Sequence, residues 1–154
     1  MKMENSVEFF CKPFGEIDPK ILYEILKLRQ DVFVLEQQCL YPDLDGFDLD
    51  CYHLWGVKND KIISTARIVP PGLIYPEASI GRVCTAFEER SNGEGKKLMT
   101  RAIACVKEIF GGVPIKIGAQ LYLEEFYRQM GFEPCSSAYD EDGILHIKML
   151  KGAF

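Results

Sequence analysis

The order of secondary-structure signals along this 154-residue chain predicts an α/β (α+β) fold with a mixed, mostly antiparallel twisted sheet flanked by helices. Two hairpin signals, at Asn59-Asp60 and at Glu141-Asp142-Gly143, indicate antiparallel strands. Two helical stripes lie between strands, and the second stripe has the position of a βαβ crossover. The expected order is β-α-β-β-β-α-β-α-β-β. The length favours one domain, residues 1–154.

The N-terminal part begins with a strand and a helix. Residues 7–14, VEFFCKPF, have the pattern of a short strand. Asp18 is a good N-cap and precedes a proline suited to the first helical position, so a helix should begin there. Its apolar stripe continues at helical spacing as far as Phe33. Residues 39–50 are then a polar, acidic loop.

Three strands and a long helix should follow the acidic loop. Residues 53–58 and 62–69 flank the two-residue turn, and Pro70-Pro71-Gly72 ends the second of these strands. Residues 78–85 form the next strand. A glycine-rich turn then leads into an amphipathic helix from about residue 95 to residue 110.

The C-terminal part should complete the sheet. Gly111-Gly112 ends the long helix, and residues 114–119 form a short apolar strand. A shorter helix over residues 123–130 comes next. Residues 133–139 and 144–150 then form the final hairpin.

Composition limits the classes of partner. Hydrophobic residues make up 47% and charged residues 27% of the chain, as in ordinary soluble domains. The net charge of −5 argues against nucleic acid as the main partner and favours a cationic or neutral substrate. No apolar run approaches the ~18 residues of a membrane span, so no membrane partner is expected.

The cysteines and the N-terminus indicate a compartment. The six cysteines form no C-x-x-C pair and have no histidine at zinc-ligand spacing, so we expect reduced thiols and no metal site. The first residues, MKMENSVEFF, contain no apolar segment typical of a secretory signal. These features predict a cytoplasmic protein.

The glycine-rich turn has the chemistry of a phosphate site. Glycines ahead of a helix allow backbone N–H groups to approach an anion, which the helix dipole also favours. A P-loop is excluded because Arg90 replaces its first glycine and Lys97 replaces its hydroxyl residue. A dinucleotide fingerprint is excluded because Leu98 occupies the place of its third glycine. The remaining pattern is R-x-x-G-x-G, over residues 90–95.

This pattern resembles the pyrophosphate loop of the GNAT acetyltransferases, Q/R-x-x-G-x-G/A. Downstream, Phe126-Tyr127 and Gly131-Phe132 resemble the family's F-Y-x-x-x-G-F signature. In that family the tyrosine is commonly the general acid that protonates the departing CoA thiolate, which implies this role for Tyr127; the alternative is an aromatic residue that only packs. Gln120 stands where many members have asparagine, and it keeps the amide with a longer reach.

The resemblance is strongest to the ElaA-like branch, whose members are predicted acyltransferases with no fixed acceptor. It covers nearly the whole chain. The loop at residues 90–96 contains more glycine than is usual in that branch. The stretches that carry the resemblance are Leu28-Arg29, Val32-Phe33-Val34, Glu36-Gln37-Gln38-Cys39, Tyr41-Pro42-Asp43-Leu44-Asp45-Gly46, His53-Leu54, Ala66-Arg67-Ile68, Ile80-Gly81-Arg82-Val83, Gly118-Ala119-Gln120 and Glu141-Asp142-Gly143-Ile144.

The resemblance implies a GNAT fold and transfer of an acetyl group from acetyl-CoA to a primary amine by direct attack. The acceptor would be a small molecule or a peptide, and the sequence leaves open whether the chain forms a homodimer. A backbone N–H of the strand that holds pantetheine would polarise the acetyl carbonyl. The implied CoA-binding residues are Val83, Cys84, Thr85, Arg90, Ser91, Asn92, Gly93, Glu94, Gly95, Lys96, Gln120 and Phe126. The alternatives are a non-catalytic acyl-CoA-binding module and a nucleotide-binding phosphotransferase.

The acceptor side is less defined by the sequence. Glu36, His53 and His146 are candidate bases for the amine proton, and a water relay is a further route. Each histidine could instead be structural. Cys84 could carry the acyl group only with a neighbouring base, and no such order of residues is visible, so direct transfer is favoured.

Four aspartates of the acidic loop could shape the same side. They do not fit an EF-hand, because tyrosines would stand at its first and twelfth positions. The loop is either a solvated turn region or a wall of the acceptor pocket, where its carboxylates would attract an ammonium group. These residues are Asp43, Asp45, Asp48 and Asp50.

Overall fold

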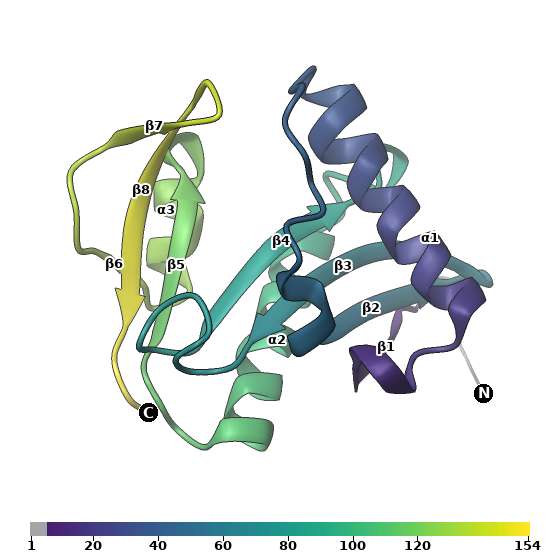
Figure 1. The fold of residues 1–154 in the computed structure, drawn as a ribbon, viewed down its shortest axis with the longest axis horizontal. Coiled ribbons are helices and arrows are strands. Elements are labelled where there is room, and N and C mark those ends of the chain that lie inside the picture. The colour runs from purple at the N-terminus through teal and green to yellow at the C-terminus, as the bar shows by residue number, and fades with distance from the viewer. Residues whose placement is uncertain (1–5) are drawn as a thin grey trace.

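The structure is a computed structural model that describes residues 6–154 (Figure 1). Its helices are α1 (Pro19–Arg29), α2 (Glu94–Phe110) and α3 (Glu124–Gln129). A π-helical segment, η2 (Gln30–Glu36), continues α1, and a 3₁₀ turn, η3 (Phe47–Asp50), precedes the second strand. The strands are β1 (Glu8–Pro13), β2 (Tyr52–Lys58), β3 (Lys61–Val69), β4 (Ser79–Thr85), β5 (Ile115–Gln120), β6 (Glu133–Pro134), β7 (Tyr139–Glu141) and β8 (Ile144–Lys151).

The strands form two antiparallel groups that meet at one point. One group has the order β1-β2-β3-β4, and the other has the order β5-β8-β6 with β7 also paired to β8. A single parallel bridge joins Ala78 to Ile115, and the Lys116 N–H donates to the Ala78 carbonyl oxygen over 2.8 Å. Beyond this bridge β4 and β5 diverge, as Figure 1 shows. The predicted mixed sheet is confirmed, and its two halves are splayed apart.

Local chemistry explains where the main elements begin and end. The Asp18 carboxylate accepts a hydrogen bond from the Lys20 N–H over 2.9 Å, so α1 begins as expected. Asn59 and Asp60 both have positive φ, 50° and 62°, as a tight hairpin turn between β2 and β3 requires. Gly111 has φ 85° and ends α2, because a left-handed residue cannot continue the helix.

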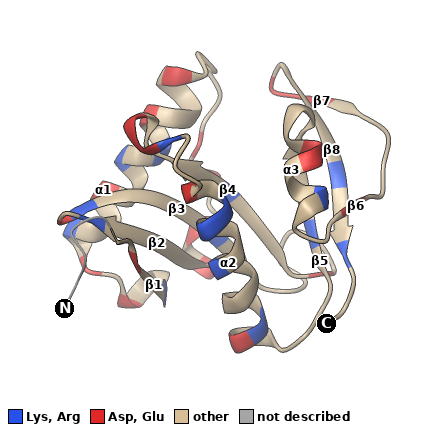
Figure 2. Cartoon of the chain, turned by 180° about the vertical axis from the view of Figure 1, so that it is seen from behind, with Lys and Arg blue, Asp and Glu red and all other residues tan. Residues whose placement is uncertain are grey.

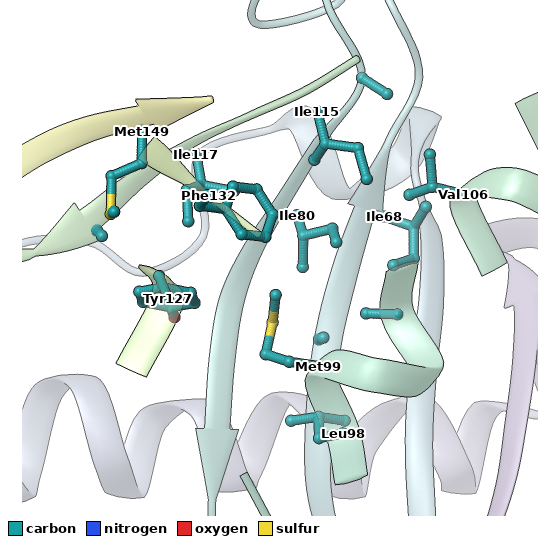
Figure 3. Close-up of a cluster of buried hydrophobic side chains, with 14 of the residues drawn as sticks. Ile68, Ile80, Leu98, Met99, Val106, Ile115, Ile117, Tyr127, Phe132 and Met149 are labelled. Atoms are coloured by element: carbon teal, nitrogen blue, oxygen red, sulfur yellow. The ribbon is translucent and has the colours of Figure 1, made fainter. Parts of the chain in front are cut away.

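The core lies where α2 packs on β3 and β4, and it continues between α3 and β5 and β8. Figure 3 shows Met99 of α2, Ile80 of β4 and Phe132 gathered in this cluster, with Tyr127 of α3 at its edge. Two smaller clusters connect α1 and η2 to the outer face of the first sheet, one through Ile25 and Trp55 and the other through Leu28 and Cys84. The main cluster and these two hold the first sheet between α1 and α2.

Two predicted elements differ from the structure. The strand expected over residues 133–139 is divided into β6 and β7, because Pro134 has no N–H and the Ser136 hydroxyl, instead of a backbone carbonyl, accepts the Lys148 N–H over 2.9 Å. The helical stripe that was expected to reach Phe33 continues to Glu36, but as a π-helix.

Within residues 6–154, none of the helices combines the length and the apolar character needed to cross a bilayer. The same residues contain no group of three or more His, Cys, Asp or Glu side chains placed to hold a metal ion.

Candidate active site

A cleft of about 830 Å³ lies where β4 and β5 diverge. One wall comes from β4 and the loop before α2, and the other from β5, α3 and β8. The chain that follows α1 runs in front of β4 and lines the cleft between the two sheets (Figure 1). The site therefore gathers residues from Val32 to His146, which lie far apart in the sequence.

A β-bulge shapes the β4 wall. Thr65 of β3 pairs with Cys84 and Arg67 pairs with Gly81, so that Ala66 alone opposes both Arg82 and Val83. Arg82 has φ 49°, which is unusual for a residue other than glycine. A bulge leaves the backbone N–H and C=O groups of the extra residue without partners in the sheet, and it bends the strand. The bulge adjoins the segment 83–85, which was expected to hold pantetheine and which lines the cleft.

The loop before α2 meets the requirements of a phosphate site. Gly93 is the N-cap of α2 with φ 74°, and no side chain caps the helix. A Cβ at Gly93 would have no atom within 4 Å, and a Cβ at Gly95 would contact only the Phe126 ring at 3.8 Å. The backbone N–H groups of the first turn are therefore accessible to an anion. Figure 2 shows basic residues in the first turns of this helix, where the sequence has Lys96 and Lys97.

Glu94 is an unusual member of this loop because its side chain is only 3% exposed. Its Oε1 lies 3.1 Å from the Lys97 ammonium, and its Oε2 has no hydrogen-bond partner among the described residues. The helix N-terminus favours a negative charge at this place. A phosphate bound at this loop would therefore lie close to the negative charge of Glu94.

Arg90 and Glu36, two predicted site residues, contact each other directly. Arg90 Nη1 lies 2.6 Å from Glu36 Oε2, and Nη2 lies 2.9 Å from Oε1. Arg90 also donates from Nε and Nη2 to the Thr85 carbonyl oxygen, over 3.1 and 3.0 Å. The end of η2 is thereby tied to the end of β4.

Tyr127 lines the cleft from α3 and is nearly buried. Its ring packs edge-on against Phe126 and Phe132, with centroids 5.1 and 6.1 Å away. Burial, with a smaller effect from Tyr122, raises the pKa of its phenol to about 12. The hydroxyl therefore keeps its proton at neutral pH.

The two histidines differ in position. His146 lines the cleft and stacks on Tyr139, and its Nδ1 lies 2.7 Å from the Ile144 carbonyl oxygen. A carbonyl only accepts, so Nδ1 carries a proton and donates it, which leaves Nε2 as the ring nitrogen that can exchange a proton. That nitrogen lies 3.4 Å from the Glu141 carboxylate.

His53 is 1% exposed and is not among the residues that line the cleft. Its Nε2 hydrogen-bonds to the Asp48 carbonyl oxygen over 2.9 Å. Burial lowers the pKa of its imidazole and outweighs the opposing effect of Asp48. Asn92 also lies outside the lining residues, whereas Gln120 belongs to them and donates to Gln37 Oε1 over 3.4 Å.

Three of the four loop aspartates are paired with arginines. The loop lines the cleft, but these carboxylates belong to a network of ion pairs. A distance of 2.8 Å separates Arg29 Nη1 from Asp48, Arg67 Nη1 from Asp45, and Arg82 Nε from Asp43. Arg29 and Arg67 are nearly buried. The network thus neutralises most of the acidic charge that the sequence places at this wall.

Sequence reasoning missed the arginine partners and the bulge. A signal for the partners was present, because Arg67 interrupts an apolar run and a buried arginine requires an anion. The bulge has no comparable signature, since its origin is the pairing register. The pairing of Arg90 with Glu36 joins residues 54 positions apart, which the sequence alone could not connect.

Comparisons with known proteins agree with this geometry. Residues 31–152 match the model of the acetyltransferase (GNAT) domain. A UPF0039 protein of Schizosaccharomyces pombe is 42% identical over 147 residues, which cover 94% of this chain and 97% of that protein. The structure resembles that of an acyl-CoA N-acyltransferase from Pseudomonas aeruginosa, with a TM-score of 0.91, 34% identity, and coverage of 96% of this chain and 100% of that one.

The crystal structure of Escherichia coli ElaA gives a TM-score of 0.89 at 36% identity, covering 95% of this chain and 99% of that one. In sequence, E. coli ElaA is 38% identical over 139 residues, which are 89% of this chain and 91% of ElaA. The chain therefore belongs to the GNAT acetyltransferase family, in its ElaA-like branch.

Proposed function

We propose that the chain is an N-acetyltransferase that transfers the acetyl group of acetyl-CoA to a primary amine by direct attack. The observation that carries this proposal is the cleft itself. The uncapped glycine N-terminus of α2 lies beside it, and a protonated tyrosine in its wall is held by aromatic packing. These are the parts needed to bind a phosphorylated thioester and to protonate its leaving group.

The roles follow from position. Backbone groups of residues 83–85 hold the pantetheine, and an N–H near the bulge polarises the thioester carbonyl. The loop at residues 90–96 binds the pyrophosphate. The amine nitrogen forms a bond to the carbonyl carbon, the C–S bond breaks, and Tyr127 donates its proton to the sulfur. Gln120 and Phe126 line the same cleft and orient the substrate.

The amine must also lose a proton, and two groups in the cleft wall can accept it. His146 can do so through the Nε2 of its neutral ring, because Nδ1 donates its proton to the Ile144 carbonyl oxygen, and Glu36 can do so through its carboxylate. Glu36→Gln and His146→Gln separate them, because only replacement of the true base should lower kcat at saturating acetyl-CoA.

The decisive experiment is a screen of amine acceptors that follows thiol release. Purified protein is incubated with acetyl-CoA and a panel of polyamines, amino acids, peptides and aminoglycosides, and longer acyl-CoAs serve as competing donors. We expect acceptor-dependent thiol release with acetyl-CoA. CoA binding without turnover on any amine would favour a binding module, and binding of ATP-magnesium instead of CoA would favour a phosphotransferase.

A further inference from the structure

The guanidinium of Arg90 is almost fully engaged. An arginine has five N–H groups. Two of those on Arg90 point to the Thr85 carbonyl oxygen and two to the Glu36 carboxylate. A phosphate and a carboxylate both accept the same fork of two N–H groups. Arg90 therefore cannot bind a phosphate through this fork while it keeps Glu36.

Glu36 begins a segment that crosses the cleft. Residues 36–39, here called the bridging segment, start at the last residue of the π-helix η2 and contact both halves of the fold. Gln37 receives a hydrogen bond from Gln120 of β5 over 3.4 Å, and the Cys39 thiol lies 3.6 Å from the Asp142 carbonyl oxygen, next to β8. On the β4 side the bridging segment is held by the pair between Glu36 and Arg90.

The strength of these contacts differs. The Glu36–Arg90 pair is bidentate and short, whereas the other two contacts are at the long limit of hydrogen bonding. Both partners of the pair are about one-third exposed, at 35% and 36%. Such a pair stabilises modestly and can be exchanged for another anion. The segment begins at the end of a π-helix, a rare conformation that frequently occurs at functional sites.

We propose that Glu36 and the pyrophosphate of CoA compete for Arg90, so that binding of the nucleotide releases the bridging segment from β4. This inference rests on the proposed function, because it assumes that the loop at residues 90–96 binds CoA. The displaced carboxylate stays in the cleft wall. There it can pair with the ammonium form of an acceptor or accept its proton, and so the donor side is coupled to the acceptor side.

The test is a double-mutant cycle on CoA affinity, measured by calorimetry without turnover. Glu36→Gln removes the competitor and should tighten CoA binding by roughly two- to tenfold, while Arg90→Gln should weaken it. In the double variant the gain from Glu36→Gln should be lost. Pantetheine, which has no pyrophosphate, should bind the wild type and Glu36→Gln equally.

Glu88→Gln is the matched control. Glu88 is exposed, lies two residues before Arg90 and does not line the cleft. Its replacement by glutamine changes the net charge by the same amount as Glu36→Gln. An equal gain in Glu88→Gln, or a gain that persists without Arg90, would show a general charge effect and overturn the competition. If Arg90→Gln does not fold, Arg90→Lys keeps the charge without the fork and should also abolish the gain. Failure of the wild type to bind CoA would instead refute the proposed function.

Discussion

At the scale of single residues, burial sets the protonation of the cleft. Tyr127 and Cys84 both line it, and burial raises the pKa of each side chain to about 12. Both groups are therefore protonated at neutral pH. This state suits a phenol that donates a proton, and it prevents a thiol from acting as a nucleophile, since the thiolate is the reactive form.

Tyr127→Phe should lower turnover by ~10²–10⁴-fold, the usual contribution of general acid catalysis. The ring and its packing against Phe126 and Phe132 remain, so that CoA affinity and stability should change little. In the wild type, kcat should show no alkaline loss from this group below about pH 11, because its pKa is about 12. A turnover within a few-fold of the wild type, where chemistry limits the rate, would assign Tyr127 to packing alone.

Cys84→Ala should retain most of the activity. Direct transfer needs no acyl-cysteine, and the pKa of this thiol is far above neutrality. The loss of a buried sulfur should lower the free energy of unfolding by about 1 kcal/mol, which urea titration can measure. Ping-pong kinetics in the wild type, together with an inactive but folded Cys84→Ala variant, would contradict direct transfer.

At the scale of elements, the start of α2 and the end of β4 form the proposed donor side. The glycine loop could be recognised in the sequence because its R-x-x-G-x-G spacing resembles a pyrophosphate loop. The P-loop and the dinucleotide fingerprint each require a residue that is missing here. The π-helix and the bulge could not be recognised, since both arise from tertiary contacts: η2 is tied to Arg90, and Arg82 is held at positive φ while its guanidinium binds Asp43. The division between β6 and β7 depends on one serine hydroxyl that replaces a backbone acceptor.

The two loop glycines allow folding and binding to be separated. Gly95→Ala lies within α2 and meets only the Phe126 ring at ordinary contact distance, so it should stabilise the fold by ~0.5–1 kcal/mol. It should leave CoA binding nearly unchanged, because the family pattern accepts alanine at this position. Gly93→Ala should weaken binding and also destabilise, since φ 74° is strained for alanine.

Calorimetry with CoA and urea unfolding of both glycine variants provide the two readouts. Gly93→Val should enlarge the loss of binding, and Gly95→Val should also weaken binding, because a branched side chain crowds the loop. Unchanged CoA affinity in both folded valine variants would remove this loop from the donor site.

At the scale of the whole molecule, the net charge of −5 is a poor guide to the local charge of the acidic loop that lines the cleft. The sequence places four aspartates in one loop, and that clustering predicted either a solvated loop or an attraction for ammonium groups. In the structure three of them form ion pairs with arginines of α1, β3 and β4, and these pairs attach the loop to α1 and to the first sheet. The three are Asp43, Asp45 and Asp48. Such pairing cannot be inferred from composition, because it depends on which strands lie beneath the loop.

Asp48 lies at the centre of this network, and its titration should couple to stability. Burial raises the pKa of its carboxyl, but the hydrogen bonds and charges of Arg29 and Arg67 outweigh burial, and the pKa lies below its ordinary 3.8. A depressed folded pKa adds stability that is fully present above the unfolded pKa. That contribution is lost as the pH falls through the lower folded pKa, so the loss is confined to pH values below about 4.

Asp48→Asn should therefore lower the free energy of unfolding by about 3–5 kcal/mol at pH 7, because it leaves two buried arginines without a full partner. Its unfolding free energy should also fall less steeply than that of the wild type below pH 4. Asp50→Asn is the control, since this exposed aspartate of the same turn has no ion pair among the described residues and should behave as the wild type. Urea unfolding from pH 2 to pH 7 gives both slopes. Equal slopes for the wild type and Asp48→Asn would mean that other carboxyl groups control acid stability and that the network only positions the loop.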